Sequence, residues 1–333
     1  MRRALLMVVC ALICISLSGC ATRYSRYQKD IFDVFDTHTM IVGYASSREE
    51  FDYMAAVIHD ELVRLHRLFD IFNEYDDINN LATINNMAGI SPVEVDKAII
   101  YLLEFAISAY EESGGAVNVA MGNMLEIWRR YRQEAGTLFP STQELNAAMT
   151  HSDISNIIID RARSTVYLSE ENMSLDVGAL AKGFALQEAM GKAVEKGFFS
   201  GLISSGGDII VIGAPMSRRR DYWSIGIRDP RNELGEVYDT LNLSGEMAVA
   251  TSGDYYRYFM VDGIILSHII DPQTMMPASR FASVTAIHQS AVMAEMLSTA
   301  LFILPYEEGK DLLELHSGQA IWLLSDGSSI RSH

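Results

Sequence analysis

Cysteine is scarce in this sequence and lies only near the N-terminus. Among the 333 residues, Cys10, Cys14 and Cys20 are the only cysteines. If export removes residues 1–19, Cys20 is the only cysteine that remains. If its sulfur is then covalently modified, the mature chain can form no disulfide. The core must then hold together by burial of apolar side chains, which a chain of this length can achieve.

Positive charge is also scarce. The sequence has 26 Lys and Arg against 43 Asp and Glu, which gives a formal net charge of -17. Such an acidic surface argues against a nucleic-acid partner. The sequence further lacks an internal repeat, a low-complexity linker and a second long hydrophobic run. We therefore predict that residues 31–333 form one compact unit.

The N-terminus carries an export pattern. Met1–Arg3 is basic, and Ala4–Leu17 is almost wholly apolar but too short for a comfortable membrane span. Leu17-Ser18-Gly19-Cys20 follows and resembles the lipobox of bacterial lipoproteins, in which the cysteine is lipidated. We predict a signal peptide over 1–19, a lipid-anchored tether over 20–30, and attachment to the extracytoplasmic face of the cell membrane. The alternative is an uncleaved membrane anchor with a chance cysteine.

Apolar periodicity predicts both helices and strands. Helical spacing and capping patterns indicate helices at 48–71, 97–112, 123–134, 141–149, 177–195, 290–303 and 306–316. Short apolar or alternating runs indicate strands at 31–46, 157–159, 165–169, 201–205, 208–212, 222–228, 236–243, 247–251, 264–270 and 319–324. The two types mix without a regular βαβ alternation. The pattern therefore favours an α+β fold with mixed, largely antiparallel sheets and packed helices.

Two glycine-containing segments could face a ligand. In Ser174–Phe184 an acidic residue and a glycine lie at the start of a predicted helix that carries Lys182 in its second turn, and a helix start offers unpaired N–H groups to an anion. The alternative is a structural N-cap by Asp176. In Ser204–Asp208 two glycines form a tight, backbone-exposed turn, which is either a binding turn or a simple hairpin.

The densest polar region comprises two segments. Ala250–Tyr255 contains hydroxyl and carboxyl groups, and Ser267–Pro272 places His268 and Asp271 three residues apart beside a proline. A histidine and an aspartate at this spacing could act as base and orienting group. A structural histidine is the alternative.

One buried-looking helix carries a possible metal site. Met293–Leu301 is apolar almost all round, yet Glu295 and Thr299 share one of its faces. A buried carboxylate is costly unless it is paired or bound to a metal, and oxygen ligands suit Mg²⁺ or Ca²⁺. The alternative is an ion pair with a distant Arg or Lys. The loop after the first long helix adds Asn73 and Tyr75, which could contact a flat base or pack on the core.

Together these segments resemble the FAD:protein FMN transferase family, long labelled thiamine-biosynthesis lipoproteins. The family pattern has a tyrosine-bearing loop, an S-G-G-A turn, D-x-G-x-x-A-K-G, G-G-D, T-S-G-x-Y, H-x-x-D-P and A-D-A-x-S-T-A. The matching segments follow in the same order: Asn73/Tyr75, Ser113–Ala116, Asp176–Gly183, Gly206–Asp208, Thr251–Tyr255, His268–Pro272 and Ala294–Ala300.

The resemblance implies roles for particular residues. His268 and Asp271 correspond to the catalytic pair. The metal ligands correspond to the Ala179 carbonyl, Glu295 and Thr299. The residues implied to contact the FAD are Thr37, Asn73, Tyr75, Ala116, Val117, Asn118, Lys182, Gly206, Gly207, Asp208, Thr251 and Ser252.

The implied reaction transfers FMN from FAD to a threonine hydroxyl of an acceptor protein and releases AMP, with Mg²⁺ (or Ca²⁺) as cofactor. The implied acceptors are subunits of membrane redox complexes or exported flavin reductases. The hydroxyl would attack the FMN-side phosphorus, and catalysis would be mainly positioning and electrostatics.

The sequence departs from the family pattern at three places. The usual M-G-T is Phe35-Asp36-Thr37, the usual acidic residue after the S-G-G turn is Asn118, and the usual metal-site Asp is Glu295. We expect activity to be retained.

Two other functions fit parts of the pattern. A metal-dependent FAD pyrophosphatase would use the same site with water as acceptor. A non-catalytic flavin-binding lipoprotein is a different class, but such proteins usually have two similar lobes, and no duplicated pattern is present.

Overall fold

The computed structural model describes residues 24–133, 139–217, 220–232, 236–255, 258–261 and 264–332. Its main sheet has the strand order β1-β2-β6-β7-β10-β15-β16-β17, and every adjacent pair is antiparallel. These strands are β1 (Ser25–Val34), β2 (Thr37–Ala45), β6 (Gly201–Ser205), β7 (Asp208–Ile212), β10 (Met247–Gly253), β15 (Ser283–His288), β16 (Gln319–Leu323) and β17 (Ser329–Arg331).

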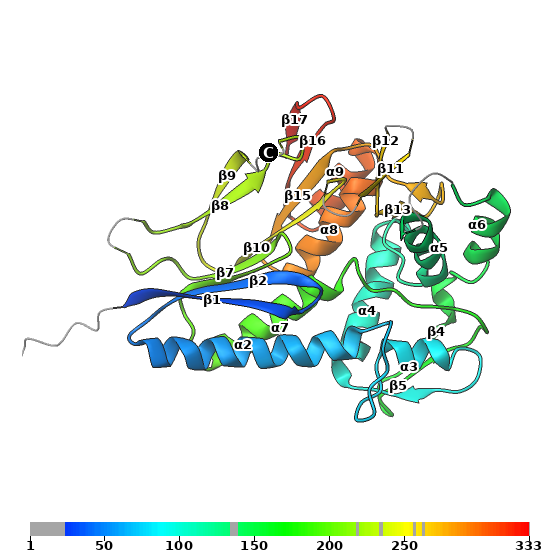
Figure 1. Ribbon diagram of the computed structural model, residues 1–333, viewed down its shortest axis with the longest axis horizontal. Coiled ribbons are helices and arrows are strands. Elements are labelled where there is room, and N and C mark those ends of the chain that lie inside the picture. Colours follow the sequence, from blue (N-terminus) through cyan, green and yellow to red (C-terminus); the bar gives the residue numbers. More distant parts are fainter. Residues whose placement is uncertain are drawn as a thin grey trace, which may run out of the picture.

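Smaller sheets and the helices complete the fold (Figure 1). The short strands are β3 (Val93–Glu94), β4 (Ile157–Asp160), β5 (Thr165–Leu168), β8 (Trp223–Arg228), β9 (Val237–Leu243), β11 (Tyr258–Val261), β12 (Ile264–Ser267), β13 (Ile270–Asp271) and β14 (Met276–Pro277). The helices are α2 (Arg48–Phe69), α3 (Leu81–Asn86), α4 (Lys97–Glu112), α5 (Gly122–Gln133), α6 (Thr142–Met149), α7 (Ala181–Glu195), α8 (Ala291–Ile303) and α9 (Tyr306–Leu315), with a 3₁₀ turn at Ile154–Asn156.

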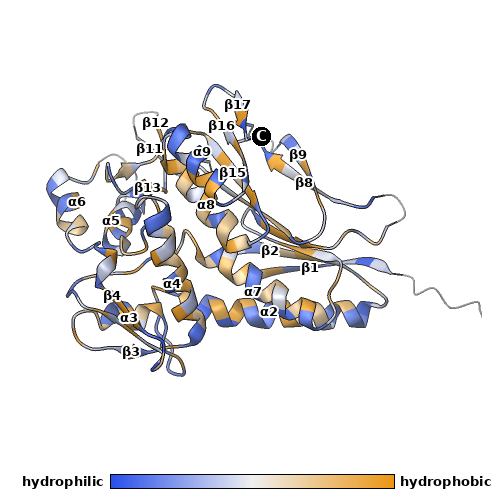
Figure 2. Cartoon of the chain, turned by 180° about the vertical axis from the view of Figure 1, so that it is seen from behind, coloured by the Kyte–Doolittle hydropathy of each residue, from blue (hydrophilic) through white to orange (hydrophobic). Residues whose placement is uncertain are grey.

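Strand alternation divides the molecule into layers. Ile203 and Ile210 point into the large core that includes α2, α7 and α8, whereas their neighbours Leu202 and Val211 pack with Trp223 of β8 on the opposite face of the sheet. Figure 2 shows the consequence: α8 is apolar along most of its length, while α2 has a polar and an apolar side. α8 is therefore a central helix, and its polar residues Glu295 and Ser298 are buried.

A second, smaller core lies beside the first. Its buried members are Met121, Met124, Trp128, Leu145, Ala148, Leu266 and Ile270. The Trp128 indole N–H donates to the Met275 carbonyl at 3.0 Å, which ties α5 to the β13–β14 ribbon. This core holds the segment that contains His268 and Asp271 against α5.

The α+β fold class and most of the predicted elements are confirmed, but several boundaries are wrong, four of them by the widest margin. The predicted tether is wrong from Ser25 on, because residues 25–30 pair with β2. The strand at 31–46 is really the end of β1, a turn and β2. The helix predicted at 177–195 begins only at Ala181, and the strand predicted at 264–270 ends at Ser267.

The signal peptide and Cys20 lie outside the described residues. Within the described ranges, no helix is both long and apolar enough to cross a membrane.

Candidate active site

Three charged groups meet where α7, α8 and β7 come together. The Lys182 ammonium is hydrogen-bonded to Asp208 and lies 3.3 Å from Glu295 Oε1. The other oxygen of Glu295 accepts from the Gly183 backbone N–H at 2.8 Å. Asp208 and Glu295 are only 4% exposed. One ammonium thus faces two buried acids, so the cluster has an excess of negative charge whenever Glu295 is ionised.

Burial and mutual attraction shift the pKa values of this cluster. Burial raises the pKa of Glu295 to about 7, and the neighbouring Asp208 carboxylate acts in the same direction against the attraction of Lys182. Burial alone would lower the pKa of Lys182, but attraction to Asp208 and Glu295 outweighs it and raises that pKa. The lysine therefore stays protonated, as a permanent cation beside the two acids.

Gly183 allows α7 and α8 to approach each other closely. A Cβ atom at this position would lie 2.5 Å from the Ala291 carbonyl oxygen and 3.0 Å from Glu295 Cβ. Only glycine therefore allows the Gly183 N–H to reach the Glu295 carboxylate.

One turn further along α8, Thr299 faces β10. Ser252 Oγ lies 3.3 Å from Thr299 Oγ1 and 3.0 Å from Ser298 Oγ. Thr251 points to the other face of the sheet, where its hydroxyl lies 2.9 Å from that of Thr285. Ser252 thus belongs to the site with Thr299, and Thr251 is joined to the opposite side of the strand.

Asp176 is not the N-cap of α7, so the alternative interpretation of this residue as a structural cap is wrong. The N-cap of α7 is Leu180, which makes no side-chain cap. Asp176 instead accepts from the Gly178 N–H at 2.9 Å and pairs with Arg129 at 2.9 Å. The resulting turn carries Ala179, which is half-buried and directly precedes the N-cap residue Leu180.

The two-glycine turn joins β6 to β7 as predicted. Gly206 and Gly207 have φ values of +57° and +101°, in the left-handed region that favours glycine. The Gly206 N–H donates to the His38 carbonyl, and a Cβ at Gly206 would lie 2.8 Å from Thr37 Oγ1. Thr37 and the glycine turn are therefore in contact, although Phe35-Asp36 replaces the family's usual residues.

Asp70 organises the loop that carries Asn73 and Tyr75. Its carboxylate accepts from the Tyr75 hydroxyl at 2.9 Å and the Asn73 amide at 3.0 Å. Burial opposes ionisation of Asp70, but these donors and two backbone N–H groups outweigh it and lower its pKa. The Arg67 guanidinium lies 4.6 Å from the centre of the Tyr75 ring. The tyrosine is thus held in place from its hydroxyl and from one ring face.

The segment after the S-G-G turn is packed into the core. Ala116 is 7% exposed and Val117 1%. Asn118 uses both ends of its amide within the protein, donating to the Ser152 carbonyl at 3.0 Å and accepting from the Ala120 N–H at 2.9 Å. Both hydrogen bonds of the Asn118 side chain therefore go to this chain's own backbone, and the FAD contact implied for Asn118 stays a prediction.

Asp271 is buried and fixed, with His268 partly exposed beside it in sequence. Asp271 Oδ1 accepts from the Gln273 N–H at 2.8 Å in the Pro272 turn. Asp271 and Ala116 line one small pocket, together with Arg280. The segment that carries Asp271 and the S-G-G turn thus meet at this pocket.

Arg129, which the sequence patterns did not single out, links the segments. It pairs with Asp176 and lies 4.7 Å from the centre of the Phe72 ring in the Tyr75 loop. The Asp176 N–H also donates to the Val119 carbonyl at 2.8 Å, next to Asn118. Another missed residue is Arg231, which holds Asp254 through two 2.7 Å hydrogen bonds. Neither arginine lies in an apolar pattern or a motif, so periodicity could not find them.

No cluster of three or more His, Cys, Asp or Glu side chains suited to a metal occurs among the described residues. The predicted ligand set contains only one carboxylate, with a backbone carbonyl and a hydroxyl, so it would not form such a cluster. Its donors are all oxygen, which fits a hard dication.

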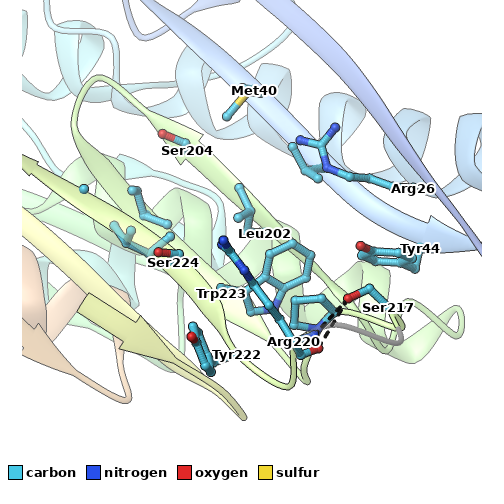
Figure 3. A pocket seen from close by; sticks show the side chains of 15 residues that line it. Arg26, Met40, Tyr44, Leu202, Ser204, Ser217, Arg220, Tyr222, Trp223 and Ser224 are labelled. Carbon is cyan, nitrogen blue, oxygen red and sulfur yellow. Dashed lines mark hydrogen bonds between the residues drawn. The ribbon is translucent and has the colours of Figure 1, made fainter. Parts of the chain in front are cut away.

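A larger cavity than the small pocket beside Asp271 lies elsewhere. It has a volume of about 430 Å³ and lies on the outer face of the sheet, between β2, β6 and β8 (Figure 3). None of the residues predicted to bind FAD lines it.

Comparison with known proteins adds to this geometry. The model of the ApbE family matches residues 35–322. The chain belongs to the ApbE family. An ApbE-family relative named FAD:protein FMN transferase, from Treponema pallidum, is 32% identical over 82% of this chain and 79% of its own length. A relative of the same name from Klebsiella pneumoniae is 29% identical over 75% and 78%.

Solved ApbE structures share the fold. The crystal structure of the ApbE protein of Thermotoga maritima superposes with a TM-score of 0.82 at 30% identity and covers 93% of this chain and 97% of its own. The flavin transferase ApbE from Vibrio cholerae, at 22% identity, has a TM-score of 0.78 and covers 93% and 98%. The predicted family is thereby confirmed, and the individual site roles stay predictions.

Proposed function

We propose that this enzyme transfers FMN from FAD to a threonine hydroxyl of an acceptor flavoprotein and releases AMP, with the aid of a divalent metal. Curated members of its family carry the name of this transferase. The observation that carries the proposal is the pair of buried acids, Asp208 and Glu295, around Lys182. On α8, Glu295 lies one helical turn from Thr299. Two buried acids and one ammonium leave negative charge that a cation would neutralise.

The residues present fit a dication of the Mg²⁺ type. Glu295, Thr299 and the Ala179 carbonyl would hold it, and Lys182 would then keep Asp208 as its partner. When bound, the metal would spread the charge that develops on the transferred phosphoryl group. Glu295 supplies a full negative charge to this site only when it is deprotonated, which a neighbouring cation favours.

The remaining residues have positioning roles. Asp70 fixes the hydroxyl of Tyr75 and the amide of Asn73, so that the ring can stack on the dinucleotide. The Gly206-Gly207 turn directly precedes Asp208, and neither glycine has a side chain that would keep a ligand from the backbone. His268 would accept the proton of the acceptor hydroxyl, and the fixed carboxylate of Asp271 would orient the segment that carries it.

The location follows from the export pattern. We propose that Cys20 carries lipid and anchors the enzyme outside the cytoplasmic membrane, next to acceptor subunits of membrane redox complexes or exported flavin reductases. FAD contains its own anhydride bond, so the reaction needs no ATP at that location.

An acceptor assay tests this function. The full-length protein is incubated with FAD, Mg²⁺ and a soluble, threonine-bearing acceptor domain of an exported flavin reductase, and flavin fluorescence of the acceptor is read on a denaturing gel. We expect a fluorescent acceptor band and one AMP per flavin attached. Replacing the acceptor threonine by valine should abolish both signals. Equal AMP release with and without acceptor, and no labelled band, would instead identify an FAD pyrophosphatase.

A further inference from the structure

The cavity of Figure 3 lies on the face of the main sheet opposite the helices. Fifteen residues enclose its volume of about 430 Å³, which is within the size range of small-molecule sites. Its floor is the outer face of the sheet, with Val42 and Leu202, and one wall is β8 with Trp223. The cavity is separated from the candidate active site by the sheet itself, because Ser204 faces it while Ser205 faces the core.

The charge of this cavity is opposite to that of the protein. Arg26 of β1 and Arg220, which precedes β8, both line it, and Figure 3 shows them entering from different segments. Among the residues that the structure describes, no Asp or Glu lines the cavity, and neither arginine has an ion pair. In a chain of net charge -17, two unneutralised guanidinium groups at one cavity indicate an anionic ligand.

The remaining lining is half polar and half apolar. The Ser204 and Ser224 side chains line the cavity and can donate to an anion. Tyr44 and Trp223 form an aromatic pair with ring centres 6.0 Å apart, and Leu202 adds an aliphatic surface. A ligand that satisfied both kinds of surface would combine an anionic group with an apolar body.

We propose that this cavity binds a phosphate-bearing amphiphile. Its phosphate would lie between Arg26 and Arg220, since guanidinium groups bind phosphate oxygens in pairs, and its apolar part would contact Trp223. Two sources share this chemistry: the headgroup of an anionic phospholipid and a soluble phosphomonoester. This site does not depend on the proposed transfer reaction.

A titration distinguishes the sources. The full-length protein in an uncharged detergent, with EDTA and without FAD, is titrated calorimetrically with dihexanoyl-phosphatidylglycerol, dihexanoyl-phosphatidylcholine, glycerol 3-phosphate and inorganic phosphate. We expect phosphatidylglycerol to bind more tightly than phosphatidylcholine. The substitutions Arg26→Gln and Arg220→Gln should each weaken binding by about 10-fold or more. The matched control is Arg163→Gln, because that side chain is 82% exposed and distant in sequence.

The outcomes separate as follows. Tight binding of the anionic lipid alone supports the headgroup source, and equal binding of glycerol 3-phosphate supports a soluble ligand. The proposal is overturned if none of the four probes binds at millimolar concentration. It is also overturned if Arg26→Gln and Arg220→Gln bind as well as Arg163→Gln. Circular dichroism of each variant checks that its fold is unchanged.

Discussion

Replacing Gly183 by alanine tests whether close contact between α7 and α8 builds the site. The added Cβ would meet the Ala291 carbonyl oxygen at 2.5 Å and carbon at 2.9 Å, and both are backbone atoms that cannot rotate away. The two helices must therefore separate. Such overpacking costs about 1–3 kcal/mol of unfolding free energy, while alanine regains about 1 kcal/mol of helix propensity. We expect a net destabilisation of up to about 2 kcal/mol.

The same helix supplies the control. Gly191 lies within α7, is exposed, and has no atom within 4 Å of the position a Cβ would occupy. Gly191→Ala should therefore stabilise the protein by up to about 1 kcal/mol. The two alanine variants should differ by the overpacking cost, about 1–3 kcal/mol, although each makes the same chemical change in the same helix.

Urea unfolding followed by circular dichroism measures the difference. Gly183→Ala should also weaken Mg²⁺-dependent transfer, because the Gly183 N–H would move away from Glu295, whereas Gly191→Ala should leave the activity unchanged. If Gly183→Ala were as stable as Gly191→Ala, the close packing of α7 on α8 would not exist, and the geometry described for Glu295 would be wrong.

Three further predictions concern the site itself. Glu295→Gln removes a charged ligand, so transfer at limiting Mg²⁺ should fall by at least about 10-fold; parental rates would exclude Glu295 as a ligand. Asp70 has a lowered pKa, so its carboxylate stabilises the fold above its ordinary pKa and loses this effect as pH falls through the lowered value. Asp70→Asn should therefore unfold more easily than the parent at pH 7 and should have a higher KM for FAD. Below about pH 4 its stability should approach that of the parent. A stability difference between Asp70→Asn and the parent that did not vary with pH would refute this. Gly206→Ala should lower the free energy of unfolding, measured in urea, more than Gly114→Ala does. Both glycines have φ near +60°, but only at Gly206 would the added Cβ meet Thr37.

Much of the fold could be predicted because the hydrophobic pattern is strong where one face of an element is buried. The helix at 97–112 and the strands at 201–205 and 208–212 have the predicted bounds. The first residues of β1 were missed because they form an exposed edge strand with little apolar alternation. β15, from Ser283 to His288, was missed because a strand buried on both faces shows no alternation, and its residues are mostly small or polar.

The site was predicted only in part, and for a physical reason. The sequence identified Lys182, Asp208 and Glu295 as separate polar residues, but their contact depends on how α7, α8 and β7 pack. Motif spacing cannot reveal a contact between residues that lie 26 positions apart, as Lys182 and Asp208 do, or 112 apart, as Gly183 and Glu295 do. The same holds for Arg129, whose role becomes visible only when Asp176 and Phe72 are placed beside it.

A crystal structure of the protein with FAD and Mn²⁺, the latter located by its anomalous signal, tests the central claim most directly. We predict one metal peak about 2.0–2.3 Å from oxygens of Glu295, Thr299 and Ala179, with the FAD pyrophosphate beside it and the Tyr75 ring on the dinucleotide. A metal bound elsewhere, with Lys182 still joining Asp208 to Glu295 and the FAD outside this cluster, would contradict the account.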